Sequence, residues 1–84
     1  MYNYEHQKQA IFTEEGQRMF LSIRDRAKQL MSNSQSATLW EIIKGHTGDS
    51  WDMVACVERL VEIGEIREIT QGDCDTQDRV FKHN

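Results

Sequence analysis

The sequence predicts a single, mostly α-helical domain that ends in a small β-hairpin. Its 84 residues suffice for one domain but not for two. Apolar residues recur at three- and four-residue steps in segments separated by turn-forming residues, which is typical of amphipathic helices. Near the C-terminus, two short stretches rich in β-forming residues flank a polar stretch. A chain of this length buries only about 60% of its unfolded surface, so the expected core is small and leaves little volume for a deep active site.

A long first helix is expected to follow an N-terminal arm. Residues 1–12 are polar apart from two tyrosines and one apolar pair, which predicts a loosely held arm that docks near its end. Thr13 is a good N-cap, and the two glutamates after it place negative charge where the helix dipole favours it. The serine-rich segment 32–36 favours a turn and ends this helix. The inward stripe consists of Gly16, Met19, Phe20, Ile23, Ala27, Leu30 and Met31.

A short second helix is expected over residues 39–44, with Thr38 as its N-cap. Trp40 is predicted to belong to the core. Gly45 supplies a C-terminal stop, because glycine readily adopts the left-handed conformation that ends many helices. Residues 46–49 then form a tight turn that leads into the next helix.

The third helix and the hairpin complete the prediction. Asp49 or Ser50 caps the helix, and Gly64 ends it. The stretches 66–70 and 79–82 are rich in β-forming residues, and the polar segment between them contains a glycine, as expected for two strands of a hairpin. The inward face of the third helix is expected to consist of Met53, Val57, Leu60 and Val61.

This order of elements resembles the winged helix-turn-helix superfamily of bacterial regulators. The resemblance lies in residues 37–43, which match the second helix, and in residues 57–66, where aliphatic residues, a glycine and an isoleucine lead from the third helix into the wing. It covers roughly residues 13–83, so the expected organisation is an arm at 1–12 and a winged domain at 13–84. The resemblance implies that the third helix enters the DNA major groove and that the hairpin lies along the backbone or the minor groove.

The leading hypothesis is therefore a small DNA-binding regulator of transcription, with double-stranded DNA as its partner. Residues at the start and on the outer side of the third helix would read the groove, and basic residues of the hairpin would hold phosphates. The expected DNA-binding residues are Ser50, Trp51, Asp52, Ala55, Arg59, Arg67, Arg79 and Lys82.

The charge pattern favours an alternative, a winged-helix module that binds another protein and no nucleic acid. The net charge is −4, and residues 36–84 carry ten acidic but only five basic side chains. The outer face of the third helix would present Asp52, Glu58 and Glu62, which phosphates repel. Trp51 on that face indicates either a contact surface or a ring that folds back onto Trp40 or the hairpin.

Homodimerisation is a further expectation, because Leu21 lies off the apolar stripe and Tyr2 and Tyr4 lie in a polar arm. These three residues form the candidate dimer seam, although scattered exposed apolar residues are also normal. Cys56 and Cys74 show no paired-ligand spacing and are expected to be reduced thiols, with a redox or metal-sensing role for Cys74 ranked lower.

No nucleophile motif, phosphate-binding loop or metal-ligand spacing is present in the sequence. We therefore expect no enzymatic activity, no cofactor and no metal. The N-terminus lacks the apolar core of a secretory signal, and no apolar run approaches the length that spans a bilayer, so a cytoplasmic location is expected.

Overall fold

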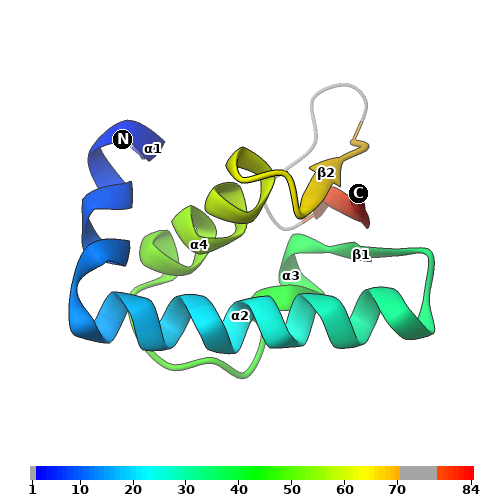
Figure 1. Ribbon diagram of the computed structural model, residues 1–84, viewed down its shortest axis with the longest axis horizontal. Coiled ribbons are helices and arrows are strands. Elements are labelled where there is room, and N and C mark those ends of the chain that lie inside the picture. The colour runs from blue at the N-terminus through cyan, green and yellow to red at the C-terminus, as the bar shows by residue number, and fades with distance from the viewer. Residues whose placement is uncertain (1, 71–77) are drawn as a thin grey trace.

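The computed structural model describes residues 2–70 and 78–84 as one mostly helical domain with a small three-stranded antiparallel sheet (Figure 1). The long helix α2 runs along one side of the molecule, and α4 lies above it. The N-terminal segment stands at one end of this pair and the sheet at the other (Figure 1). The elements in the described residues are α1 (Tyr4–Gln7), the 3-10 helix η1 (Lys8–Phe12), α2 (Glu14–Asn33), β1 (Ser36–Thr38), α3 (Leu39–Ile43), α4 (Ser50–Glu62), β2 (Ile66–Glu68) and β3 (Val80–His83).

The helix starts follow the predicted capping residues. The Thr13 hydroxyl accepts a hydrogen bond from the backbone N–H of Gly16. Thr38 forms a full capping box with Glu41, because each side chain accepts from the backbone N–H of the other. Of the two candidate caps for α4, Asp49 takes the role: its carboxylate accepts from the first two N–H groups that follow Ser50.

The end of α4 confirms the predicted stop at Gly64. Gly64 has a φ of +82°, a conformation that residues with a Cβ atom rarely adopt. Its N–H donates to the carbonyl of Val61, and the N–H of Glu65 donates to that of Leu60, both at 3.0 Å. This pair of bonds is the Schellman motif, and it turns the chain so that Ile66 is buried against the core.

The sheet contains the predicted hairpin and one strand that was not predicted. β2 and β3 pair antiparallel; β2 ends two residues earlier than expected, and β3 is shifted by one residue towards the C-terminus. The unpredicted strand is β1, which begins at the end of the serine-rich segment 32–36 that was predicted as a turn. β1 pairs with the free side of β3, so the strand order is β1-β3-β2. Ala37 of β1 lies opposite Phe81 of β3, and both side chains are buried against the helices.

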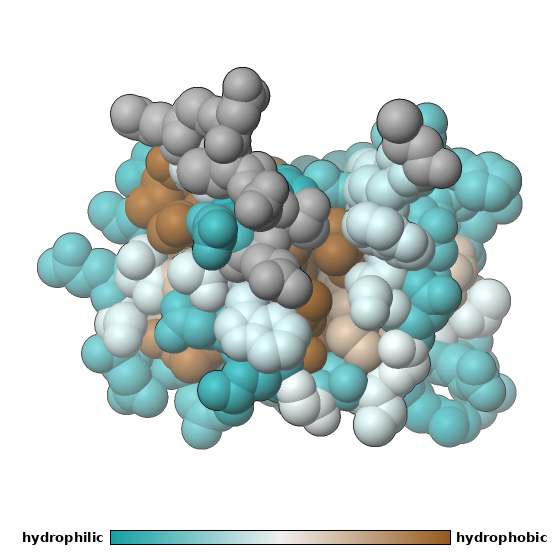
Figure 2. Space-filling view, turned by 180° about the vertical axis from the view of Figure 1, so that it is seen from behind, coloured by the Kyte–Doolittle hydropathy of each residue, from teal (hydrophilic) through white to brown (hydrophobic). Residues whose placement is uncertain are grey.

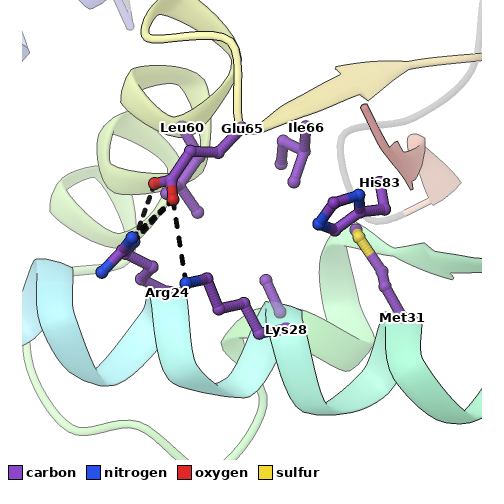
Figure 3. Close-up of a pocket in the computed structure, with 8 residues that line it drawn as sticks. Arg24, Lys28, Met31, Leu60, Glu65, Ile66 and His83 are labelled. Atoms are coloured by element: carbon purple, nitrogen blue, oxygen red, sulfur yellow. Dashed lines mark hydrogen bonds and ion pairs between the residues drawn. The ribbon is translucent and has the colours of Figure 1, made fainter.

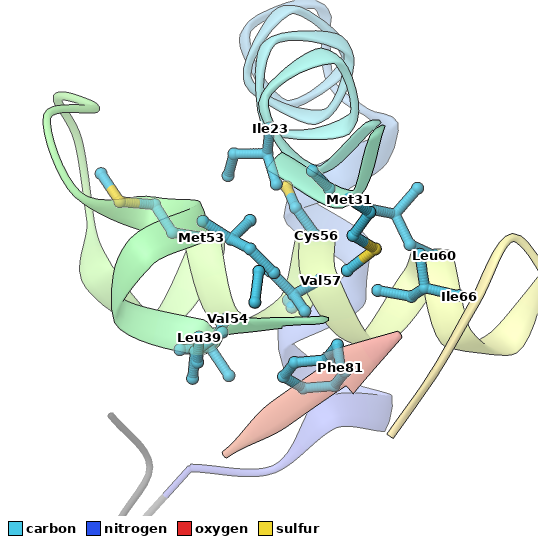
Figure 4. Packing of buried hydrophobic residues seen from close by; sticks show 14 of the residues in the cluster. Ile23, Met31, Leu39, Met53, Val54, Cys56, Val57, Leu60, Ile66 and Phe81 are labelled. Atoms are coloured by element: carbon cyan, nitrogen blue, oxygen red, sulfur yellow. The ribbon is translucent and has the colours of Figure 1, made fainter. Parts of the chain in front are cut away.

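The core lies between α2, α4, α3 and the inner face of the sheet (Figure 4). The predicted inward residues of α4 are buried, except that Val61 is only partly so. Trp40 was expected in the core, and that expectation is wrong: its side chain is 50% exposed, because the neighbouring Leu39 and Ile42 of α3 turn inward instead. Cys56 is buried, whereas Cys74 lies outside the described residues.

Candidate binding surface on helix α4 and the sheet

The middle of helix α4 is enclosed on all sides, although the sequence predicted one exposed face. Five consecutive residues, Met53–Val57, are buried, and five residues in a row cover every direction around a helix. Ala55 was expected on the outer, groove-reading face, but it is 0% exposed. Ala55 does lie on the face of α4 that was predicted to be the outer one. The prediction that this face is open to solvent is wrong, because another part of the chain packs onto it.

The N-terminal segment is that covering part. Residues 2–12 include α1 and η1, which pack across α4 (Figure 1). The predicted docking near the end of the arm is confirmed at Ile11, but the rest of the segment is not the loosely held arm that was expected. Ile11 anchors the segment and is only 2% exposed. The absence of a side chain at Gly16 permits the close approach, since a Cβ atom there would lie 2.7 Å from the Cα atom of Ile11 and closer still to the carbonyl oxygen of Ala10.

The two tyrosines of the segment bind α4 of their own chain. The Tyr2 ring stacks on Trp51 with a centroid distance of 5.2 Å, and its hydroxyl donates to Glu58. The Tyr4 hydroxyl donates to Glu62 at 2.8 Å. Burial and the acceptor carboxylates raise the pKa of both tyrosines. The predicted dimer seam is therefore not brought together, because both tyrosines face α4 while Leu21 is exposed on α2.

The charged residues of α4 are also engaged within the chain. Gln7 donates to the carboxylate of Asp52. Glu62 accepts from Arg59 at 2.6 Å and from Lys8 at 3.4 Å, and the hydrogen bond from Arg59 is the main cause of its lowered pKa. The Arg59 guanidinium lies 5.4 Å from the centre of the Phe12 ring. Three of the residues predicted to read DNA (Trp51, Asp52 and Arg59) thus contact the N-terminal segment.

Arg79, predicted to hold phosphates, lies between two carboxylates. Its guanidinium is 3.2 Å from Glu58 of α4 and 2.7 Å from Glu68 of β2. The hydrogen bond to Glu68 is the main cause of the raised pKa of Arg79, and the same bond lowers the pKa of Glu68. This arginine joins the sheet to α4, so its charge is largely compensated inside the protein.

Arg67 and Lys82 differ from Arg79. They lie directly opposite each other on β2 and β3, and Ser36 of β1 lies opposite Lys82 on the other side. Within residues 2–70 and 78–84, neither cation has a carboxylate within 4.0 Å. Arg67 is exposed and Lys82 is half-buried; of the other predicted DNA-binding residues, Ser50 is exposed at the first position of α4.

The enclosed space beside α2 is too small for a ligand. A void of 10 Å³ lies under the ion pair of Arg24 and Glu65, whose nitrogen–oxygen distances are 2.6 to 2.8 Å (Figure 3). Such a volume holds about one water molecule. Lys28 lies 3.9 Å from the same carboxylate. In the described part of the chain, no group of three or more His, Cys, Asp or Glu side chains is placed to hold a metal ion.

An open apolar groove lies where η1, α2 and the end of α4 meet. Its volume is 280 Å³, and Phe12, Phe20 and Ile63 line it together with Ile11, Gln17 and Arg59. Phe12 is 59% exposed and Ile63 45%. The face opposite that of Figure 1 also shows apolar atoms in its middle, between weakly polar and hydrophilic side chains (Figure 2).

Comparison with known proteins gives no family: no family model, no curated protein and no solved structure matches this chain. Among the helices of the described residues, none has both the length and the apolar character needed to cross a bilayer.

Proposed function

We propose that the chain is a winged helix-turn-helix domain that binds another protein. The winged-helix assignment is supported by the order of the elements, in which α2, α3, a turn, α4 and the antiparallel β2–β3 pair follow one another. The same order carried the resemblance in the sequence. β1 adds a third strand to the expected hairpin.

The enclosure of α4 is the observation that carries the choice of partner. A recognition helix reads base edges by entering a major groove about 12 Å wide, so its outer face must be open. Here the N-terminal segment occupies that face and Ala55 is fully buried. Displacing the segment would not create a DNA-reading surface. It would uncover the carboxylates of Asp52, Glu58 and Glu62, which phosphates would repel, and the ion pairs of Glu58 with Arg79 and of Glu62 with Arg59 would remain.

The apolar groove is the surface we assign to the protein partner. Its charged residue, Arg59, is already paired with Glu62 at 2.6 Å, so the groove offers no free cation to a phosphate. Leu21 lies one helical turn beyond Gln17, which lines the groove, and is 52% exposed. A partner that inserts an apolar side chain would remove these surfaces from water, which contributes about 25 cal/mol for each Å² buried.

A comparison of matched double variants tests this function. Phe12→Ser with Ile63→Ser removes two apolar side chains of the groove, and Trp40→Ser with Ile69→Ser removes two exposed ones outside it. Immobilised wild-type chain and the second variant should retain the same protein from a nuclease-treated lysate, and the first variant should lose it. Circular dichroism verifies that both variants fold. Equal retention by both variants, or the absence of any specifically retained protein with the wild-type chain, would contradict the proposal.

Double-stranded DNA is a second candidate partner, favoured by the opposed cations Arg67 and Lys82. In this case the chain is a small DNA-binding regulator, as the resemblance implies, but α4 is not its contact surface. Fluorescence anisotropy with a labelled mixed-sequence duplex near 50 mM salt measures this directly, since electrostatic affinity is greatest at low salt. An absence of binding there would eliminate this candidate.

A further inference from the structure

We infer that the protein partner binds through an acidic, amphipathic helix that places an apolar side chain in the groove and a carboxylate beside Lys28. This inference rests on the proposed function and names the chemistry of the partner. Three features of the structure support it: the residues along one flank of α2, the charges beside the groove, and the helices that line it.

One flank of α2 changes from apolar to basic along its length. Phe20, Arg24 and Lys28 follow one another at four-residue steps, so their side chains lie nearly in one row on the helix. Phe20 lines the apolar groove. Arg24 and Lys28 lie beside the carboxylate of Glu65, just beyond the end of α4 (Figure 3). A partner that follows this row therefore meets the apolar groove at one end and two cations at the other.

The basic end of the flank combines two cations with one carboxylate in the described part of the chain. Arg24 donates to Glu65 at 2.6 to 2.8 Å, whereas the Lys28 ammonium lies 3.9 Å away, which is too long for a hydrogen bond. The Lys28 side chain is 51% exposed. Its ammonium can therefore turn to the carboxylate of a partner while the pair of Arg24 and Glu65 stays intact. Complementary charge favours an acidic partner over a basic one at this position.

The elements around the groove favour a helical partner. All of the residues that line it lie in α2, in η1 or at the end of α4. The groove therefore offers no strand edge with which an extended peptide could pair, and an amphipathic helix in a groove of helices is the alternative mode of peptide recognition. Leu21 and Lys28 are seven residues apart on α2, which corresponds to about 10 Å. A helix lying along α2 covers this distance with side chains about two turns apart.

Selection from displayed random peptides of about 16 residues, which can form about four helical turns, tests this inference. The full wild-type chain is the bait. Counter-selection against Phe12→Ser with Ile63→Ser removes peptides that bind outside the groove. The selected peptides are synthesised with a fluorescent label, and anisotropy measures their Kd.

Lys28→Glu is the test variant for these peptides. Lys44→Glu is the matched control, because it makes the same change in charge beside the opposite flank of α2, where Arg26 and Gln29 lie. Circular dichroism verifies that both variants fold. Lys28→Gln, which removes the charge without adding another beside Glu65, should show a smaller effect of the same sign.

The expected peptides carry an apolar residue and an aspartate or glutamate about seven positions apart. Lys28→Glu should weaken their binding about tenfold near 50 mM salt and less near 500 mM, because salt screens an exposed ion pair. Lysine in place of the acidic residue of the peptide should restore the affinity for Lys28→Glu. The Lys44→Glu control should change the affinity by less than about twofold.

The possible failures are distinguishable. Groove-dependent peptides that bind Lys28→Glu as tightly as the wild type would overturn the acidic partner, while the proposed function stands. Absence of any groove-dependent peptide would contradict both. Self-association of the wild type that Phe12→Ser with Ile63→Ser abolishes would assign the groove to a second copy of the chain and would also overturn the inference.

Discussion

Substitution of Gly16 by alanine tests the enclosure of α4 most directly. Its helix propensity would raise the stability of the protein, whereas its overlap with the N-terminal segment would lower it. Gly16 lies in the first turns of α2, where alanine is the better helix former by about 1 kcal/mol. If the N-terminal segment were loose, Gly16→Ala would therefore stabilise the protein. In the structure, the added Cβ atom would lie 2.7 Å from the Cα atom of Ile11, whereas non-bonded carbon atoms prefer about 3.5–4.0 Å.

The size of the expected destabilisation follows from the apolar burial that the N-terminal segment would lose. The obstructing atoms belong to the backbone, so a side-chain rotation cannot relieve the overlap. The segment has to shift, and Ile11 is its buried anchor. Full burial of an isoleucine side chain contributes about 1.5–3 kcal/mol. After subtracting about 1 kcal/mol for the better helix former, Gly16→Ala should lower the free energy of unfolding by about 0.5–2 kcal/mol.

Urea denaturation followed by circular dichroism measures this change. Gln29→Ala is the control, because it introduces the same residue at an exposed position of α2, and its effect should stay within about 0.5 kcal/mol. In a domain of this size, 1 kcal/mol corresponds to a shift in Tm of about 4–8 °C. A Gly16→Ala protein that is as stable as the wild type or more stable would refute the packing of residues 2–12 on α4.

Three further predictions concern single side chains. Burial raises the pKa of the Cys56 thiol to about 12, so in a Cys74→Ser background a thiol reagent at pH 8 should label Cys56 only as fast as the protein unfolds, and rapid labelling would contradict its burial. Thr38→Ala should cost about 1 kcal/mol of stability and Thr38→Ser much less, because only serine keeps the cap; equal losses in urea denaturation would contradict the capping role. The hydrogen bond from Arg24 lowers the pKa of Glu65, so the ion pair should stabilise the fold above the ordinary glutamate pKa and lose that contribution as the pH falls through the lowered value. Thermal unfolding from pH 7 to 3 should show a smaller acid-induced loss in Glu65→Gln than in the wild type.

The helices were predictable because their signals are local. Thr13 and Thr38 begin helices at the predicted positions, and Gly64 ends α4 with the expected left-handed conformation. In each case the residue acts on backbone groups within a few positions of itself, so no knowledge of the rest of the fold is needed.

The enclosure of α4 was missed although the sequence contains a signal for it. The prediction placed one inward face around Val57 and assigned Ala55 to the outside. The run Met53–Val57 is apolar without interruption, and a helix that is apolar all round is a buried helix. That pattern could have shown that a second layer covers α4. The apolar pair at the end of the arm predicted docking only there. The extent of the layer could not be deduced, because α1 contains no buried residue and its side chains Tyr4 and Gln7 reach α4 by hydrogen bonds.

β1 was missed because nothing local distinguishes it from a turn. The strand has only three residues, Ser36–Thr38, and it follows a serine-rich stretch that favours turns. Its pairing partner, β3, lies far along the chain, close to the C-terminus. The prediction of phosphate-binding residues also lacked this non-local information. It grouped three cations by charge alone: Arg67, Arg79 and Lys82. Only the strand register and the ion pairs distinguish Arg79 from the other two.

The central position of β3 makes the sheet dependent on a single short segment. β1 and β2 do not pair with each other, so each is joined to the sheet through residues 80–83. Proteolytic removal of this segment would leave two unpaired strand edges at once, and unpaired edges are templates for pairing between molecules. Damage at the C-terminal end should therefore lead to aggregation rather than to a smaller folded domain.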